Sequence, residues 1–268
     1  MSHVVLQPTP EILKLSDVID QGVVGFINAR FTVPQSGKWE AHVEAMLLLN
    51  LAIRDIEAIL ELAQTDLVLL PAANILARAV FEIMVKSAWM VQPDDPYQRE
   101  VRWLVHLEED ARLNEQIATR VGKFGGDARI FQERGITLRD FVDGVSAKLP
   151  VGYRKPPRNP NVEDMLESIG QKKMYSVYRL LAAYVHGGHA STWLYRQHLG
   201  TEKEIGEFIT PAEWRLPLWA SWSSLHFLGQ YVLERVGAKE PQFVSLEQSA
   251  AIDQAFISLD SKVSQKAP

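Results

Sequence analysis

Arg179 and His186 are the two side chains whose types and spacing best suit a catalytic pair. They lie seven positions apart in the segment YRLLAAYVHGGH (178–189). Seven residues are close to two turns of α-helix, so both side chains fall on one helix face. Gly187 and Gly188 follow directly, which predicts that the helix ends at His186. A histidine placed there can move a proton on or off a ribose oxygen while an arginine binds the scissile phosphate. The pattern therefore suggests RNA cleavage.

Aromatic and basic residues gather around this pair. The residues expected to contact substrate are Tyr175, Tyr178, Lys172, Lys173, Arg154 and Lys155, the last two from the proline-rich loop KLPVGYRKPPRNPN (148–161). Single-stranded nucleic acid is bound by stacking on aromatic rings and by contact of its phosphates with positive charge. The neighbourhood of His186 thus indicates RNA as the substrate.

Two other interpretations of the pair stay open. An Arg–His spacing of this kind arises easily and can be structural, as Arg99 and His106 illustrate on what reads as the polar flank of a surface helix. Alternatively, His186 and His189 form an H-x-x-H pair that could bind zinc. The two glycines between these histidines and the lack of a nearby acidic residue weigh against a metal site. We therefore assign no metal.

The elements that must position these residues are helices. Helical periodicity and boundary signals predict helices over 11–31, 39–64, 71–90 and 95–120, and two more that begin near 211 and 246. Asp95 before Pro96, TPAE (210–213) and SLEQ (245–248) are the clearest helix starts. No stretch alternates apolar and polar residues between hairpin turns as a sheet requires. The expected fold class is all-α, a bundle of long helices.

We expect one all-α domain over 1–268, with a core of about 39–190 and C-terminal helices over 211–260 packed on it. Two apolar stripes at helical spacing provide the faces that amphipathic helices pack inward. These are Val43, Leu47, Leu51 and Ile59 in one helix, and Ile75, Ala79 and Ile83 in the next. The tryptophans of the C-terminal part, Trp214, Trp219 and Trp222, belong either to this core or to a dimer interface.

Arg78, Glu82 and Lys86 recur every four residues on an otherwise apolar helix. One interpretation is a row of salt bridges facing water. The other is that Glu82 turns toward the cleft and orients Arg179, which makes it a supporting residue of the site.

Composition excludes several classes of protein. The net charge of −5 gives no overall field for nucleic acid, so any contact with RNA must be local. The absence of cysteine excludes disulfides, thiolate metal sites and a cysteine nucleophile. No phosphate-binding loop, nucleophile elbow or dinucleotide fingerprint is present. The N-terminus does not read as a signal peptide, and we expect the apolar runs, broken by Asn50, Pro71 and Arg78, to be too short to span a bilayer. We expect a soluble, cytoplasmic protein.

An Arg followed after four to six residues by a His, on a late helix of a small all-α bundle, resembles the HEPN superfamily. LARAVFEIMVKSAWMV (76–91) and YSVYRLLAAYVHGG (175–188) look like uncharacterised bacterial HEPN-like families, over roughly 70–190. The superfamily includes RNase toxins of toxin–antitoxin pairs, abortive-infection proteins and RNA-cutting CRISPR subunits. The resemblance implies that Arg179 and His186 are catalytic and that two copies of the chain form one metal-independent site.

The function expected is a metal-independent endoribonuclease of the toxin or phage-defence kind, without cofactor. Its expected partners are single-stranded RNA, a second copy of the chain, and an antitoxin or regulatory protein, with no membrane. The alternative is a catalytically inactive helical bundle that binds a protein or a nucleotide. Leu180 keeps that alternative open, since active members commonly carry a polar residue after the Arg.

Overall fold

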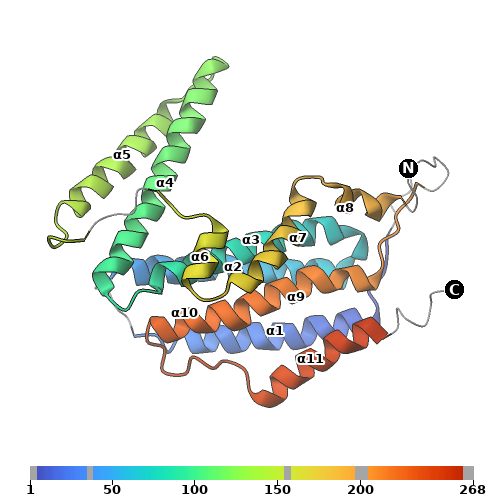
Figure 1. The fold of residues 1–268 in the computed structure, drawn as a ribbon. Helices are drawn as coiled ribbons and strands as arrows, with labels where there is room; N and C mark the ends of the chain where they lie inside the picture. The colour runs from blue at the N-terminus through green and yellow to red at the C-terminus, as the bar shows by residue number, and fades with distance from the viewer. Residues whose placement is uncertain (1–4, 35–38, 154–157, 197–204, 262–268) are drawn as a thin grey trace.

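The computed structural model describes residues 5–34, 39–153, 158–196 and 205–261, and within these ranges every regular element is a helix (Figure 1). An isolated bridge between Arg196 and Ile205 is the only β-type pairing in the described part of the chain. The all-α prediction is confirmed.

The predicted helices are present, and α5 and α6 are additional to them. The main elements are α1 (Pro10–Arg30), α2 (Glu40–Thr65), α3 (Leu70–Val91), α4 (Pro96–Lys123), α5 (Arg129–Ser146), α6 (Val162–Ser168), α7 (Tyr175–Val185), α8 (His189–Thr192), α9 (Arg215–Ser223), a π-helical segment (Ser224–Gly229), α10 (Gln230–Arg235) and α11 (Leu246–Ser261).

The three helix starts marked by capping residues are confirmed. Asp95 accepts a hydrogen bond from the backbone N–H of Tyr97 at 2.9 Å and opens α4. Ser245 and Gln248 cap each other's backbone N–H groups before α11, at 2.9 and 3.1 Å. TPAE forms a capping box that opens a 3₁₀ turn (Pro211–Trp214) leading into α9. These contacts depend only on residues three positions apart or closer, which is why sequence predicts them well.

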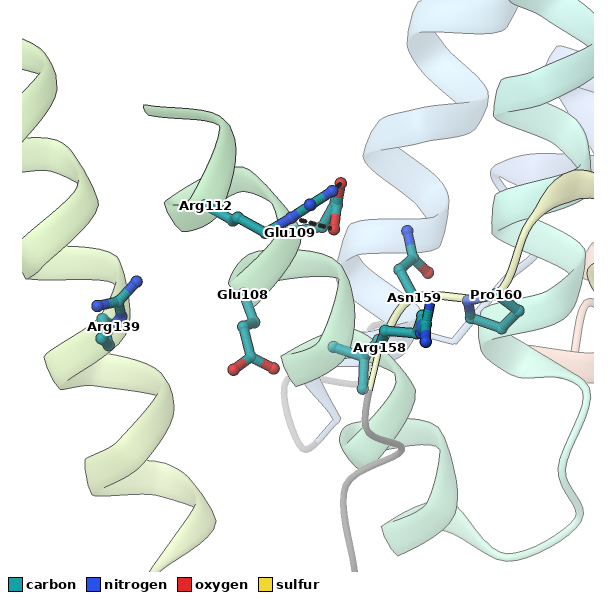
Figure 2. Close-up of a pocket in the computed structure, with 8 residues that line it drawn as sticks. Glu108, Glu109, Arg112, Arg139, Arg158, Asn159 and Pro160 are labelled. Carbon is teal, nitrogen blue, oxygen red and sulfur yellow. Dashed lines mark hydrogen bonds and ion pairs between the residues drawn. The ribbon is translucent and has the colours of Figure 1, made fainter. Parts of the chain in front are cut away.

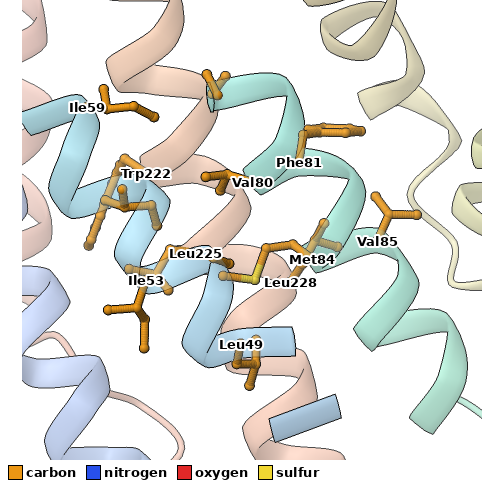
Figure 3. Packing of buried hydrophobic residues seen from close by; sticks show 14 of the residues in the cluster. Leu49, Ile53, Ile59, Val80, Phe81, Met84, Val85, Trp222, Leu225 and Leu228 are labelled. Atoms are coloured by element: carbon orange, nitrogen blue, oxygen red, sulfur yellow. The ribbon is translucent and has the colours of Figure 1, made fainter. Parts of the chain in front are cut away.

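The core is built around α3. This helix packs most extensively against α2 and also against α7, α9 and the π-helical segment. Figure 3 shows Val80 and Met84 of α3 on the side of Ile53 of α2, with Trp222 and Leu225 from the C-terminal helices. All five side chains are buried. Helix α7, which carries His186 at its end, therefore packs on the central helix of the bundle.

By length and composition, α3 with the turn before it (Leu67–Val91, mean hydropathy 1.8) would be able to cross a membrane. The expectation that this run is too short is wrong, because Pro71 lies in the first turn and Arg78 does not break the helix. In the bundle, however, α3 is surrounded by α2, α7 and α9. This is the place of a core helix in a soluble protein.

The apolar stripe of α2 that was predicted to face the core faces mostly solvent. Val43, Leu47 and Leu51 are 40, 56 and 51% exposed, and of that stripe Ile59 is buried. On α3 the predicted stripe is only partly outward: Ile75 is 50% exposed, whereas Ala79 and Ile83 are half-buried and Ile83 packs against the core. The inward face of α2 is instead rich in small residues, including Ala41, Ala45, Ala52 and Ala63. Alanine lets helix backbones approach closely, so this face, which also carries Leu49, Ile53 and Ile56, packs inward and leaves Leu47 and Leu51 outside.

The tryptophans divide between core and surface. Trp214 and Trp222 are buried, and Nε1 of Trp214 donates a 2.9 Å hydrogen bond to the carbonyl of Leu67. Trp219 is 38% exposed on α9.

Helices α4 and α5 form an antiparallel arm that projects from the bundle (Figure 1). Gly135 of α5 lies so close to α4 that a Cβ there would sit 3.3 Å from the carbonyl oxygen of Ala111. Helix α5 packs mainly against α4, and of its residues Gly135 and Val142 are buried.

The Arg99–His106 pair does not lie on a polar flank. Arg99, Arg102 and Arg235 all donate hydrogen bonds to carbonyl groups at the end of α3 or just beyond it. Burial lowers the pKa of Arg102 to about 10. Arg99 contacts His42 rather than His106. The role of this second pair is structural, since three guanidinium groups satisfy carbonyls that the helix itself leaves unpaired.

Candidate functional site

Helix α7 presents the predicted site at its C-terminal end. Val177 and Leu181 anchor one face of the helix in the core. The N–H of Gly188 donates to the carbonyl of Ala183 at 2.9 Å, and Gly187 has a φ of 60°. This geometry is a Schellman-type helix end that needs a left-handed residue, which glycine adopts without strain. His186 therefore sits at the last position of the helix, exposed, as its sequence predicts.

The arginine that contacts His186 is Arg78 of α3. Its Nη1 lies 3.2 Å from Nε2 of His186. Its Nη2 donates to the hydroxyl of Tyr178 at 3.1 Å, and its Nε donates to Oε1 of Glu82 at 2.8 Å. The guanidinium also lies over the ring of Tyr178, 5.0 Å from the ring centre. We refer to Arg78, Glu82, Tyr178 and His186 as the Arg78 cluster.

The Arg78 cluster holds a charged guanidinium against His186. The Arg78 side chain is 15% exposed and that of Glu82 is 31% exposed. Burial disfavours the charged guanidinium, but hydrogen bonds and charge from Glu82 and Tyr178 outweigh it and raise the pKa of Arg78. A guanidinium has only donors, so its contact with His186 is a hydrogen bond when Nε2 is unprotonated. In that state the histidine carries its proton on Nδ1 and presents a lone pair beside a permanent positive charge.

Arg179 shares the exposed side of α7 with His186 but takes no part in the cluster. It is exposed, and no hydrogen bond or ion pair joins it to another described residue. Glu82 pairs with Arg78 and not with Arg179. The two helices do come together as the Glu82 interpretation required, since α3 and α7 are in contact. The arginine that Glu82 orients is, however, Arg78, which precedes it by one turn on α3.

The two predicted tyrosines lie together along α7. The rings of Tyr175 and Tyr178 stack at 5.6 Å, and Tyr178 also packs against Phe81 at 6.3 Å. Both rings are half-buried. Tyr178 thus links the core to the Arg78 cluster, while Tyr175 extends the aromatic surface by one turn.

The predicted basic residues lie away from His186 where the structure describes them. Lys172 and Lys173 are exposed at the opposite end of α7, and Lys172 pairs with Glu167 at 3.1 Å. Arg154 and Lys155 lie outside the described residues. The flanks of their loop contact α4, since the hydroxyl of Tyr153 donates to Oδ2 of Asp95 at 2.6 Å.

His189 does not form a metal site with its described neighbours. Nδ1 of His189 lies 3.2 Å from Oγ1 of Thr192, and its ring lies 5.1 Å from that of Trp193. Among the residues placed by the structure, no group of three or more His, Asp or Glu side chains is arranged to hold a metal ion.

Arg78 was not predicted to belong to the site. Its signal was present, because an arginine followed four residues later by a glutamate stands out in a helix that is otherwise apolar and buried. A charge in such a helix requires a partner. The identity of a partner more than one hundred positions away cannot be read from spacing.

Comparison with known proteins yields one result. No curated protein and no solved structure matches the chain significantly. A family model, described as a family of unknown function, matches residues 44–207. That range includes α3, α7 and the whole Arg78 cluster. The chain therefore belongs to the DUF5677 family.

Proposed function

We propose that this protein is a metal-independent endoribonuclease that cuts single-stranded RNA, with His186 and Arg78 at the centre of its site. The observation that carries the proposal is the 3.2 Å contact between Nη1 of Arg78 and Nε2 of exposed His186. A proton-transfer group thereby stands next to a phosphate-binding group whose position is held by Glu82.

The chemistry follows from these groups. His186 takes the proton of a ribose 2′-hydroxyl, whose oxygen attacks the adjacent phosphorus and expels the 5′-oxygen of the next nucleotide. The products are a 2′,3′-cyclic phosphate and a 5′-hydroxyl, the latter completed by a proton returned from the acid form of a histidine. Arg78 turns from His186 to the phosphate and stabilises the charge that develops on its oxygens.

The surroundings supply surfaces for the rest of the RNA. Arg179 is exposed on the outer side of α7 and can contact a neighbouring phosphate. Tyr175 and Tyr178 offer stacked aromatic rings, and Lys173 adds positive charge near the start of the helix. In a chain of net charge −5, such a local set of groups is what RNA would need.

Two further features of the proposal are a homodimer and a defence role. The resemblance to HEPN proteins, in which two copies complete one site, supports both of them. It also supports a cytoplasmic setting with an antitoxin or regulatory protein. The exposed apolar side chains Val43, Leu47 and Leu51, one turn apart along α2, support an interface, because large apolar residues in a row are unusual on a monomer surface.

The second candidate function is a catalytically inactive bundle that binds a protein or a nucleotide. One observation favours it: Glu82 already neutralises Arg78, so the cluster can serve simply to join α3 to α7. In that case His186 is the exposed end of a structural network.

The experiment that separates the two candidates uses a mixed RNA pool in EDTA. Wild type is compared with His186→Ala and with a matched control, His189→Ala, which removes an exposed histidine three positions later. Cleavage to 2′,3′-cyclic phosphate ends by wild type and His189→Ala, with loss in folded His186→Ala, supports the nuclease. Equal cleavage by all three variants assigns the activity elsewhere, and no cleavage by any favours the inactive bundle.

A further inference from the structure

A cavity lies where the α4/α5 arm meets the bundle. Its volume is about 490 Å³. Figure 2 shows that its lining comes from α4, from Arg139 on α5 and from the segment 158–160. Three arginines, Arg112, Arg139 and Arg158, line this one cavity together with Glu108 and Glu109.

Two of these arginines are held in place but keep donors to spare. Arg112 uses Nε and Nη2 for the carboxylate of Glu109, and Arg139 uses Nη2 for Glu115. Each guanidinium has five N–H donors, so most of those on Arg139 and part of those on Arg112 remain for a ligand. The Arg112 and Arg139 side chains are 60 and 51% exposed, and ion pairs at such exposure are weak enough to be exchanged.

Asn159 lines the same cavity and carries an unpaired acceptor. Oδ1 of Asn159 is buried, and none of the described residues donates a hydrogen bond to it. A buried amide oxygen without a donor costs free energy, so the Asn159 side chain would gain a partner by turning toward a ligand that supplies an O–H or N–H group. The cavity thus suits a ligand that has an anionic group for the arginines and a hydrogen-bond donor for Asn159.

We infer that this cavity binds a small phosphate ester of nucleoside monophosphate size. Arginine forks match the geometry of phosphate oxygens, and the phosphate would lie between Arg112, Arg139 and Arg158. The hydroxyl or amino groups of the ester would donate to Asn159. The volume falls in the range of small-molecule sites. This site is built by α4, α5 and 158–160, whereas the Arg78 cluster is built by α3 and α7, so the inference does not rest on the nuclease proposal.

Isothermal titration calorimetry on the full chain tests this inference with AMP, GMP, CMP and UMP, and with adenosine and inorganic phosphate as comparisons. At least one monophosphate should bind, more tightly than inorganic phosphate, and adenosine should bind at least tenfold more weakly than AMP if AMP is that ligand. Arg158→Gln and Arg112→Gln should each raise the Kd at least tenfold. Arg129→Gln, which removes an arginine from the same arm outside the cavity, should leave the Kd unchanged.

Asn159→Leu separates binding of the phosphate by the arginines from recognition of the rest of the ester by Asn159. It should weaken the monophosphate but leave the affinity for inorganic phosphate unchanged. Circular dichroism shows whether each variant is folded. Failure of all four monophosphates to bind overturns the inference, as does equal binding by folded Arg158→Gln and Arg112→Gln. Inorganic phosphate binding as tightly as every monophosphate would reduce the cavity to a site for adventitious anions.

Discussion

Arg78 of α3 and His186 at the end of α7 stand 108 positions apart in the chain, yet Nη1 of the arginine lies 3.2 Å from Nε2 of the histidine. By sequence spacing alone, Arg179 of α7, seven residues before His186, is the more obvious partner of the histidine. The contact across two helices makes Arg78 the stronger candidate for phosphate binding, and this ordering of the two arginines can be tested directly.

Arg78→Lys should reduce RNA cleavage about 100-fold, because lysine cannot reproduce the fork that joins Glu82, Tyr178 and the phosphate. Arg179→Lys, at an exposed position, should cost less than about tenfold. Initial rates on one RNA substrate, with thermal melts to compare folding, measure both. A larger loss in Arg179→Lys would restore the pair suggested by spacing alone.

Glu82→Gln should lower cleavage about tenfold or more, because Arg78 would lose the carboxylate that positions it. The free energy of unfolding should fall by less than about 1 kcal/mol, as for other ion pairs one helical turn apart. Glu57→Gln, which breaks the Arg54–Glu57 pair on α2, is the matched control and should leave cleavage unchanged. Equal cleavage by the two variants would mean that Glu82 does not position Arg78.

Stability should fall in mild acid through His42. Burial, together with the charge of Arg99, lowers the pKa of His42 to about 4. In the unfolded chain this histidine takes up a proton near pH 6.5. Its contribution to the free energy of unfolding is therefore complete above pH 6.5 and is lost as the pH falls toward 4. The full shift corresponds to about 3.4 kcal/mol, which partial exposure of the ring reduces to about 1–2 kcal/mol.

Urea unfolding at pH 7.5 and 4.5 measures this loss. His42→Asn keeps an acceptor for Arg99 but cannot titrate, so the difference between the two pH values should be smaller in the variant by that amount. Identical pH dependence in wild type and variant would show that His42 is not the group responsible.

Gly22→Ala should destabilise the bundle by about 1–3 kcal/mol, because a Cβ at this position of α1 would lie 2.4 Å from Cζ3 of Trp222. In contrast, a Cβ at Gly122 of α4 meets nothing within 4 Å, so Gly122→Ala should be neutral or slightly stabilising. Chemical denaturation of the two variants compares the same substitution at a tightly packed position and at an open surface position. A neutral Gly22→Ala would mean that the tryptophan can move aside.

Helix positions could be predicted well because their signals are local. Asp95, Ser245 and Gln248 each cap a helix from within the first turn, and the structure has these contacts. Faces were harder to predict. Helix α2 carries apolar residues on more than one side, so periodicity alone could not show that Ala45 and Leu49 are buried while Leu47 is exposed.

The candidate site was predicted in part for the same reason. The spacing of glycines placed His186 at a helix end, which is a local property and is confirmed. Its contact with Arg78 depends on how α7 lies across α3, and that is decided by packing at Phe81, Val177 and Leu181. Such long-range contacts leave no periodic trace in one sequence.

The arm formed by α4 and α5 has a consequence for local unfolding. Since α5 packs mainly against α4 and buries few side chains, its opening costs much less free energy than opening α3. Amide hydrogens of α5 should therefore exchange with deuterium well before those of α3, while the rest of the bundle stays folded. Arg139, which lines the arginine cavity, lies on this same helix, so a ligand bound there should slow the exchange of α5 selectively.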